Sequence, residues 1–385
     1  MNIKIPKNFF GEEIELTVFI SEEQIHNASV GKCYGKYFED TGIFNVYPDS
    51  LKEKGDFLGD IFPANSEANT DGFCGIISAN GVDFYWNGKK INTESYSLYQ
   101  SIFSRNEGIL ETNVMNEKRV VILGCGSVGS LVSMELARAG VGNFVLVDAD
   151  TLEYHNLCRH QCGIEDVGDL KVNALKRKLL SINPSVNVIT FDGIFQNIPK
   201  DILDGFCVPN ETIFVGCADN RTADVYANRI SIYYDAAFIS VGFWERAFAG
   251  EIFYHIPHKN MPCYECALGD GGDVSGRVEA NHHVYSNQED LEKVKFEPGI
   301  SVDINFITSI GIKLIIDILN STNENYIPRL LNNLNQYTLV CNTCNPDIGG
   351  EMVEIFSYPL QVTTSLVVGF NKACGKECKY ERKEK

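Results

Sequence analysis

The 385-residue sequence has no run of about 18 consecutive apolar residues, the length that a membrane-spanning helix needs. It is also poor in basic residues, with 33 Lys and Arg against 51 Asp and Glu and a formal net charge of −18. Nucleic acids and anionic membranes are bound through basic surfaces, so this balance excludes both as main partners. Residues 1–7 are followed by polar and acidic residues rather than by the apolar core of a secretory signal. We therefore expect a cytoplasmic protein.

The 13 cysteines are too thinly spread for a secreted disulfide scaffold and too many for a typical cytosolic enzyme. Several of them lie in close pairs, which indicates metal binding. One pair is Cys263-x-x-Cys266, and a tetrahedral zinc site needs a second pair to close it. Two second pairs are available, and the spacing alone leaves the choice open: Cys341 with Cys344, or Cys374 with Cys378.

Residues 1–104 have the composition of a separate module. Residues 14–20, 73–77 and 82–86 are rich in strand-forming residues, and Asn80-Gly81 between the last two runs predicts a hairpin turn. The polar residues 52–69 predict a loop. We find no chemical motif in this module and expect a small α+β domain that serves as an accessory or substrate-recognition domain.

Residues 119–148 contain the pattern around which the rest of the chain is organised. An apolar run at 119–123 predicts a buried strand, the sequence GCGSVG follows at 124–129, residues 130–139 predict a helix, and 143–147 predict a second strand. Gly124 allows a tight turn, Gly126 lets the backbone approach a phosphate, and Gly129 lets the helix pack closely on the strand. The helix N-terminus favours an anion. The sequence therefore predicts a nucleotide site, with Asp148 placed to bind a ribose.

Strands and helices continue to alternate after this unit. Strands are predicted at 186–191, 213–217 and 237–241, with a helix at 169–181, which together indicate a parallel sheet with helices on both faces. Residues 300–319 predict a buried core or dimer-interface helix, because four polar residues interrupt its apolar run. Residues 337–370 are predicted to be strands. We expect residues 105–385 to form one Rossmann-like, doubly wound α/β domain.

Polar residues gather where the predicted strands end. Asp148, Asp150, Asn156, Arg159 and His160 lie within thirteen residues of one another, followed by Gly168-x-x-Lys171. Asp219-Asn220-Arg221 follows another apolar strand, so it belongs at the carboxyl edge of the same sheet, where ligands bind in open α/β folds. A carboxylate there suits Mg²⁺, which prefers one or two carboxylates together with phosphate oxygens. An NAD-dependent oxidoreductase would need only Asp148 among these acids, so the other charged residues count against that function.

These motifs, GCGSVGS, VDAD, NLCRH, Gly168-x-x-Lys171 and CADNR, resemble those of the E1-type adenylyltransferases, a family that includes ThiF, MoeB, microcin-type peptide adenylyltransferases and ubiquitin-activating enzymes. The resemblance covers residues 100–380 and keeps the family's motif order. It implies the adenylation fold, with ATP, Mg²⁺ and Zn²⁺ as cofactors. The residues that we assign to ATP and its metal ion are Gly124, Gly126, Ser127, Gly129, Asp148, Asp150, Asn156, Arg159, Lys171, Asp219 and Asn220.

The resemblance extends to catalysis, dimerisation and zinc. Arg159, Lys171 and Asp219 would act on the phosphates and Mg²⁺, whereas His160 departs from the family's usual glutamine and is as well explained by packing. Arg105 lies in a segment similar to one whose arginine reaches into the partner subunit's ATP site, which implies a homodimer. The family places its second zinc pair after the last strand, which favours Cys263, Cys266, Cys374 and Cys378 as the zinc ligands.

The activity implied is the adenylation of the C-terminal carboxylate of a ubiquitin-like protein or ribosomal peptide, releasing pyrophosphate. Residues 267–299 lack the thioester-forming cysteine that many ubiquitin-activating relatives carry, so a role in microcin-type peptide modification stays open. A non-catalytic E1-like scaffold is a further alternative, although the intact charged residues count against it.

Overall fold

The computed structural model describes residues 5–68, 71–218, 220–268, 298–361 and 364–371, together with Cys374 and Cys378. The chain divides into two compact units, Met1–Arg105 and Asn106–Lys385. No helix in the described ranges is long and apolar enough to cross a membrane. Each unit has its own sheet and its own buried core, and each is described separately below.

The first unit is an eight-stranded sheet with the order β7-β6-β5-β4-β2-β3-β1-β8. Alternate side chains of its strands, among them Val82, Phe84 and Trp86, point into one apolar core. The strands are β1 (Thr17–Ser21), β2 (Gly31–Phe38), β3 (Ile43–Val46), β4 (Asp56–Phe62), β5 (Phe73–Ser78), β6 (Gly81–Trp86), β7 (Lys89–Lys90) and β8 (Asn92–Tyr96). The short helices are α1 (Glu22–His26), η1 (Asp49–Lys54), α2 (Leu98–Phe103) and η2 (Ser104–Asn106).

The hairpin predicted at Asn80-Gly81 is present between β5 and β6. The loop predicted over residues 52–69 is wrong in part, because β4 lies inside it. Its acidic residues are exposed, while Leu58 and Gly59 are buried in the sheet. A side chain at Gly59 would overlap the carbonyl oxygen of Phe73, so the glycine that weakens the strand pattern is required by the neighbouring strand.

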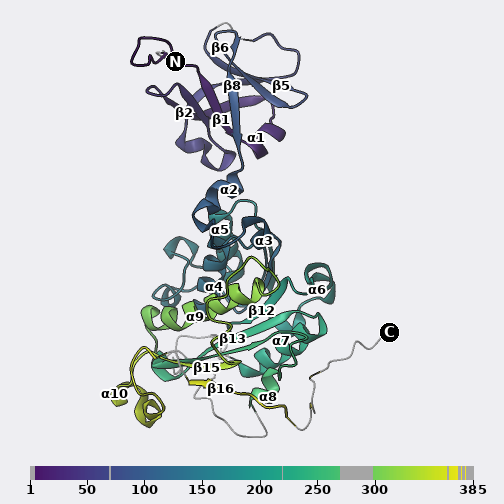
Figure 1. The fold of residues 1–385 in the computed structure, drawn as a ribbon, viewed down its shortest axis with the longest axis vertical. Coiled ribbons are helices and arrows are strands. Elements are labelled where there is room, and N and C mark those ends of the chain that lie inside the picture. The colour runs from purple at the N-terminus through teal and green to yellow at the C-terminus, as the bar shows by residue number, and fades with distance from the viewer. Residues whose placement is uncertain are drawn as a thin grey trace. The chain divides into compact units, whose positions relative to one another are not determined.

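The second unit is built on an eight-stranded sheet with the order β11-β10-β9-β12-β13-β14-β15-β16. Strands β12, β13, β15 and β16 are labelled in Figure 1. The first five of these strands in that order are parallel, and the last three are antiparallel. The strands are β9 (Arg119–Leu123), β10 (Asn143–Asp148), β11 (Asn187–Asp192), β12 (Thr212–Gly216), β13 (Ala237–Phe243), β14 (Ala249–His255), β15 (Tyr337–Cys341) and β16 (Thr364–Leu366). The strand order reverses between β9 and β12, which confirms the doubly wound α/β fold and marks the point where ligands bind.

Helices cover both faces of this sheet. Residues of α4, α5 and α9 pack on one face, and residues of α6, α7 and α8 pack on the other. The central strands are buried on both sides, as expected of a parallel sheet. The helices are α3 (Thr112–Glu117), α4 (Ser127–Arg138), η3 (Tyr154–Asn156), η4 (Ile164–Asp166), α5 (Lys171–Ile182), η5 (Phe195–Asn197), α6 (Lys200–Phe206), α7 (Arg221–Tyr233), η6 (Glu245–Ala247), α8 (Tyr264–Leu268), α9 (Ser301–Leu319), α10 (Pro346–Gly349) and η8 (Gly350–Ile355).

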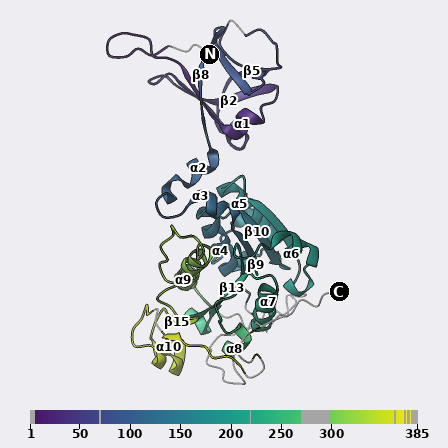
Figure 2. The same cartoon turned by 45° about the vertical axis from the view of Figure 1, so that its right-hand side comes forward.

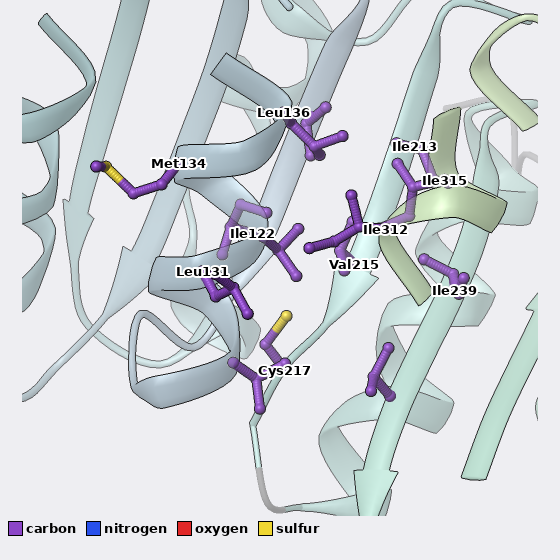
Figure 3. Close-up of a cluster of buried hydrophobic side chains, with 14 of the residues drawn as sticks. Ile122, Leu131, Met134, Leu136, Ile213, Val215, Cys217, Ile239, Ile312 and Ile315 are labelled. Atoms are coloured by element: carbon purple, nitrogen blue, oxygen red, sulfur yellow. The ribbon is translucent and has the colours of Figure 1, made fainter. Parts of the chain in front are cut away.

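The core beneath the glycine loop joins α4 to the long helix α9. The two helices lie side by side in the turned view (Figure 2), and they are in contact. Leu131 and Leu136 from α4, Ile312 and Ile315 from α9, and Ile122 from β9 are all buried in this one cluster (Figure 3). The sheet edge and the start of α4 are therefore fixed by dispersion and by the removal of large apolar side chains from water.

Asp317, one of the polar residues that interrupt the apolar run of α9, has a structural role. Asp317 is fully buried, and its carboxylate accepts hydrogen bonds from the Tyr326 hydroxyl at 2.6 Å and from the backbone N–H of Leu330 at 2.6 Å. The backbone N–H groups of Arg329 and Leu331 also donate to it. A buried carboxylate is tolerated when several donors satisfy it. The helix is a buried core helix, as the sequence predicts.

The strands predicted across residues 337–370 are only partly correct. β15 and β16 form, but residues 346–355 are α10 and η8. Asn345 accepts a hydrogen bond from the backbone N–H of Asp347 and so caps a helical turn that Pro346 opens. These capping signals outweigh the strand propensity of the apolar residues around them.

Candidate functional site

The glycine loop follows β9 and has the geometry that its sequence predicts. Gly124 has φ +93°, which a side chain would strain. A side chain at Gly129 would overlap the carbonyl oxygen of Gly124, so the first turn of α4 packs directly on the loop. At Gly126 a Cβ would meet no protein atom within 4 Å, which leaves this side of the loop open. α4 begins at Ser127, three residues before the predicted start, with Gly126 at its N-cap and no side-chain cap.

Asp148 ends β10 beside this loop. Its carboxylate accepts hydrogen bonds from the backbone N–H of Cys125 at 2.6 Å and from that of Asp150 at 2.8 Å. Burial raises the pKa of the Asp148 carboxyl, and the nearby Lys171 ammonium opposes this shift. The side chain thus closes the glycine loop onto the end of the neighbouring strand.

Lys171 is the first residue of α5, and only 10% of its side chain is exposed. Its ammonium lies 2.7 Å from a carboxylate oxygen of Asp150, whose own side chain is 70% exposed. The backbone N–H of Lys171 also donates to the carbonyl of Asp150 at 2.9 Å. Lys171 is distant in sequence from Asp148 and Asp150, and the three residues form one charged group at the carboxyl edge of the sheet.

The segment after β10 returns to the start of α4. The Ser127 hydroxyl donates to the backbone carbonyl of Arg159 at 2.9 Å, which brings Arg159 to the helix N-terminus. The His160 ring is buried and donates through Nε2 to the carbonyl of Cys125 at 2.7 Å, while its Nδ1 accepts from the backbone N–H of Cys162 at 3.0 Å. Both ring nitrogens are thus used within the protein, which supports the packing role for His160. The side-chain oxygen of Asn156 accepts from the backbone N–H of Glu153, so it caps η3.

The end of β12 forms the other side of the switch point. Asn220 caps α7 through a hydrogen bond from the backbone N–H of Ala223 at 3.0 Å. Asp219 lies outside the described residues, as does most of the 267–299 stretch. Sequence reasoning missed Asp224, which is buried on α7 and accepts from the Ser240 hydroxyl at 2.6 Å. A buried acid has no distinctive spacing in a polar helix, so nothing in the sequence marks it.

Arg105 belongs to the first unit, whose placement relative to the second is not described. That Arg105 reaches into the ATP site of a partner subunit therefore stays a prediction.

Four cysteines converge near the end of the chain. The sulfurs of Cys263, Cys266, Cys374 and Cys378 all lie within 4.8 Å of one another. The Cys263 and Cys266 sulfurs are 3.6 Å apart, and Cys266 is 3.6 Å from Cys378. Four thiolates around one zinc at about 2.3 Å would be separated by about 3.8 Å, so the spacing fits a tetrahedral ion. Backbone N–H groups of Cys263 and Asn371 donate to two of the sulfurs, which favours thiolates.

The remaining cysteines are separate from this cluster. Cys341 and Cys344 face each other with sulfurs 3.6 Å apart, and no third ligand residue among the described residues joins them. Cys162 and Cys217 are buried in the domain, as expected of core cysteines. Cys158 is exposed, and its sulfur lies on the surface turn that follows η3.

Parts of the chain are similar to known proteins. One stretch of 187 residues is 32% identical to ubiquitin-like modifier-activating enzyme 5 of Dictyostelium discoideum and covers 46% of this chain and 48% of that protein. The adenylyltransferase and sulfurtransferase UBA4 of Meyerozyma guilliermondii is 26% identical over 197 residues, which is 50% of this chain and 44% of that protein. The chain spans about half the length of the curated relatives it matches. Among solved structures, E. coli MccB with ATP aligns with a TM-score of 0.47 and 22% identity, over 69% of this chain and 68% of that one.

A family model also matches this chain. It spans residues 101–347, which is more than half of the chain. This range includes the glycine loop, Asp148, Lys171 and the cysteine pair Cys263 and Cys266. The chain belongs to the ThiF family.

Proposed function

We propose that this protein uses ATP to adenylate the C-terminal carboxylate of a ubiquitin-like protein. The observation that carries the proposal is the charged group of Asp148, Asp150 and Lys171 beside an open glycine loop at the switch point of the sheet. This site offers groups that can bind a ribose, a chain of phosphates and a cation. Membership of the ThiF family and the names of the curated relatives support the same activity.

In this account each residue has one task. Asp148 accepts hydrogen bonds from the ribose hydroxyls, and the open backbone at Gly126 approaches the phosphates. Lys171 and Arg159 neutralise charge as the substrate carboxylate attacks the α-phosphate and pyrophosphate leaves. The protein supplies position and electrostatic stabilisation rather than a nucleophile of its own. Mg²⁺ would supply further charge neutralisation at the phosphates, and we assign its carboxylate ligand to Asp219 from the sequence alone.

The four-cysteine cluster we assign to Zn²⁺. Its ligand set is closed, with no position for water or substrate, so its role is structural. The proposed reaction takes place in the cytoplasm, and the absence of disulfides among all 13 cysteines is consistent with this compartment.

The relatives' names favour a ubiquitin-like protein over a ribosomal peptide as the substrate. Because residues 267–299 contain no cysteine, we expect the enzyme to stop at the acyl-adenylate or to pass it to an outside nucleophile. Incubation with ATP, Mg²⁺ and a candidate ubiquitin-like protein or peptide substrate should give a product carrying AMP, detected by intact mass. An enzyme adduct that thiol reagents release, above all on the exposed Cys158, would contradict this outcome.

We also propose that the enzyme is a homodimer in which Arg105 completes the partner's ATP site. Arg105→Ala and Lys171→Ala proteins should each be inactive alone. A mixture should regain up to about a quarter of the wild-type pyrophosphate exchange, because one site in each mixed dimer keeps both residues. Subunit exchange is verified with differently tagged chains. Efficient subunit exchange without recovered activity would show that Arg105 does not act across the dimer.

A further inference from the structure

Cys341 and Cys344 form a thiol pair that the proposed reaction and the zinc cluster leave unused. Cys341 is the last residue of β15 and is fully buried, whereas Cys344 is partly exposed. Their sulfurs lie 3.6 Å apart, and a disulfide needs about 2.05 Å. The two residues are separated by Asn342 and Thr343 only, a spacing that a disulfide can span. A small rotation or shift of this turn would therefore bring the sulfurs into bonding distance.

Asn342, which lies between the two cysteines, holds a hairpin at the carboxyl edge of the parallel strands. The backbone N–H of Asn342 donates to the carbonyl of Phe248 at 2.8 Å, and its side-chain amide donates to the carbonyl of Ala247 at 2.7 Å. The same amide donates to the carbonyl of Asp303 in the first turn of α9 at 3.0 Å. Asn342 is itself buried. It is thus a clamp that joins the hairpin at residues 244–248 to the long helix.

The clamped hairpin is strained. Arg246 and Ala247 both have φ +51°, a conformation that residues with a side chain rarely adopt. Two such residues in succession persist only where surrounding contacts hold them. The hairpin follows β13, whose neighbour β12 ends beside the glycine loop. It therefore lies on the sheet edge that carries the proposed ATP site.

We propose that Cys341 and Cys344 are a reversible disulfide site that exchanges with small disulfides such as oxidised glutathione, and that bridging loosens the Asn342 clamp on the hairpin. Closing the gap shortens the distance between the two sulfurs by about 1.5 Å, and the same short turn carries both cysteines and Asn342. The clamp bonds of 2.7 and 2.8 Å fail once they lengthen beyond about 3.5 Å. The thiol state of the pair is thereby coupled to the shape of the sheet edge.

The exchange proceeds in two balanced steps. The Cys344 thiolate attacks one sulfur of oxidised glutathione, the glutathione disulfide bond breaks, and one glutathione thiolate leaves. Cys341 then loses its proton and attacks the Cys344 sulfur, which releases the second glutathione. The two protein thiols are oxidised, one glutathione disulfide is reduced, and both thiol protons end on the released glutathiones. Burial raises the pKa of the Cys341 thiol to about 12, which assigns the first attack to the accessible Cys344.

The test equilibrates full-length, metal-loaded protein with mixtures of reduced and oxidised glutathione and needs no substrate. Peptide mass spectrometry should find a Cys341–Cys344 bridge that forms and reverses with the glutathione ratio, while bound zinc stays constant. Hydrogen exchange in peptides covering residues 244–248 and 337–345 should become at least about tenfold faster in the bridged protein. Failure of the adenylation proposal would leave both readouts unchanged.

Two variants separate the parts of the proposal. Cys344→Ala should remove the bridge and keep slow exchange at every glutathione ratio. Asn342→Asp, which loses the amide donor, should show the faster exchange in fully reduced protein. Cys158→Ser should leave the bridge intact, since Cys158 has no thiol neighbour among the described residues and can form only a mixed disulfide. The proposal is overturned if no Cys341–Cys344 bridge appears at any ratio, or if the bridge forms and the exchange rates do not change.

Discussion

Replacing Lys171 with alanine should lower pyrophosphate exchange by at least about 100-fold while the protein stays folded. Only 10% of this side chain is exposed, and its ammonium is held 2.7 Å from Asp150 at the end of β10. A fixed cation in a water-poor site stabilises the charge that develops on the phosphates, and loss of one such group costs about 10²–10³ in rate. The measurement is substrate-dependent ATP–pyrophosphate exchange, with circular dichroism and thermal unfolding as folding checks.

Lys178→Ala is the matched control. Lys178 lies on the same helix and is paired with Glu165 at 2.7 Å, away from the glycine loop. It should keep exchange within about twofold of wild type, because its partners Glu165 and the buried Asp166 are outside the proposed ATP site. Arg177 still pairs with Asp166 in this variant. Equal losses of exchange in the two variants would mean that both substitutions act by destabilising α5, and that Lys171 has no specific role in the reaction.

The second large effect concerns the four-cysteine cluster. Purified protein should contain one zinc per chain, and Cys263→Ser should lose it together with several kcal/mol of unfolding free energy. A structural zinc contributes its binding energy to folding, about 10–16 kcal/mol in small zinc domains, although a larger core retains part of the structure here. Elemental analysis measures the zinc, and thermal unfolding measures the stability.

Cys341→Ser tests the alternative pairing directly. Cys341 is buried like Cys263, but its sulfur is outside the four-sulfur cluster. This variant should keep its zinc and lose only the packing of one buried sulfur. Zinc lost from Cys341→Ser and kept by Cys374→Ser would show that the metal is bound by the other pair.

The features that could be predicted from the sequence are those that the backbone itself dictates. Gly124 and Gly129 are required by a positive φ and by a close approach of two backbones, so their spacing marks the loop directly. Asp148 is marked in the same way, because the last residue of a parallel strand must lie at the ligand-binding edge. The fold and the region of the site could thus be obtained from local patterns.

Features that depend on long-range packing could not be predicted. The strand β4 contains two aspartates and a glycine, and only its neighbours in the sheet explain why it is a strand. In the sequence, Asp317 only interrupts an apolar helix. The structure shows that its carboxylate binds the backbone of residues 329–331. The second pair of the cysteine cluster lies about a hundred residues from the first, so spacing alone could not choose it. The roles of Arg105 and Asp219 remain predictions.

The most direct test of the central claim is ATP–pyrophosphate exchange with a small ubiquitin-like protein or peptide that ends in a free carboxylate. Adenylation requires a free C-terminal carboxylate to attack the α-phosphate, so the native partner should support exchange. The same partner with an amidated C-terminus should support none, because an amide cannot form the acyl-adenylate. Exchange that proceeds equally with the amidated partner, or without any partner, would contradict the proposed reaction.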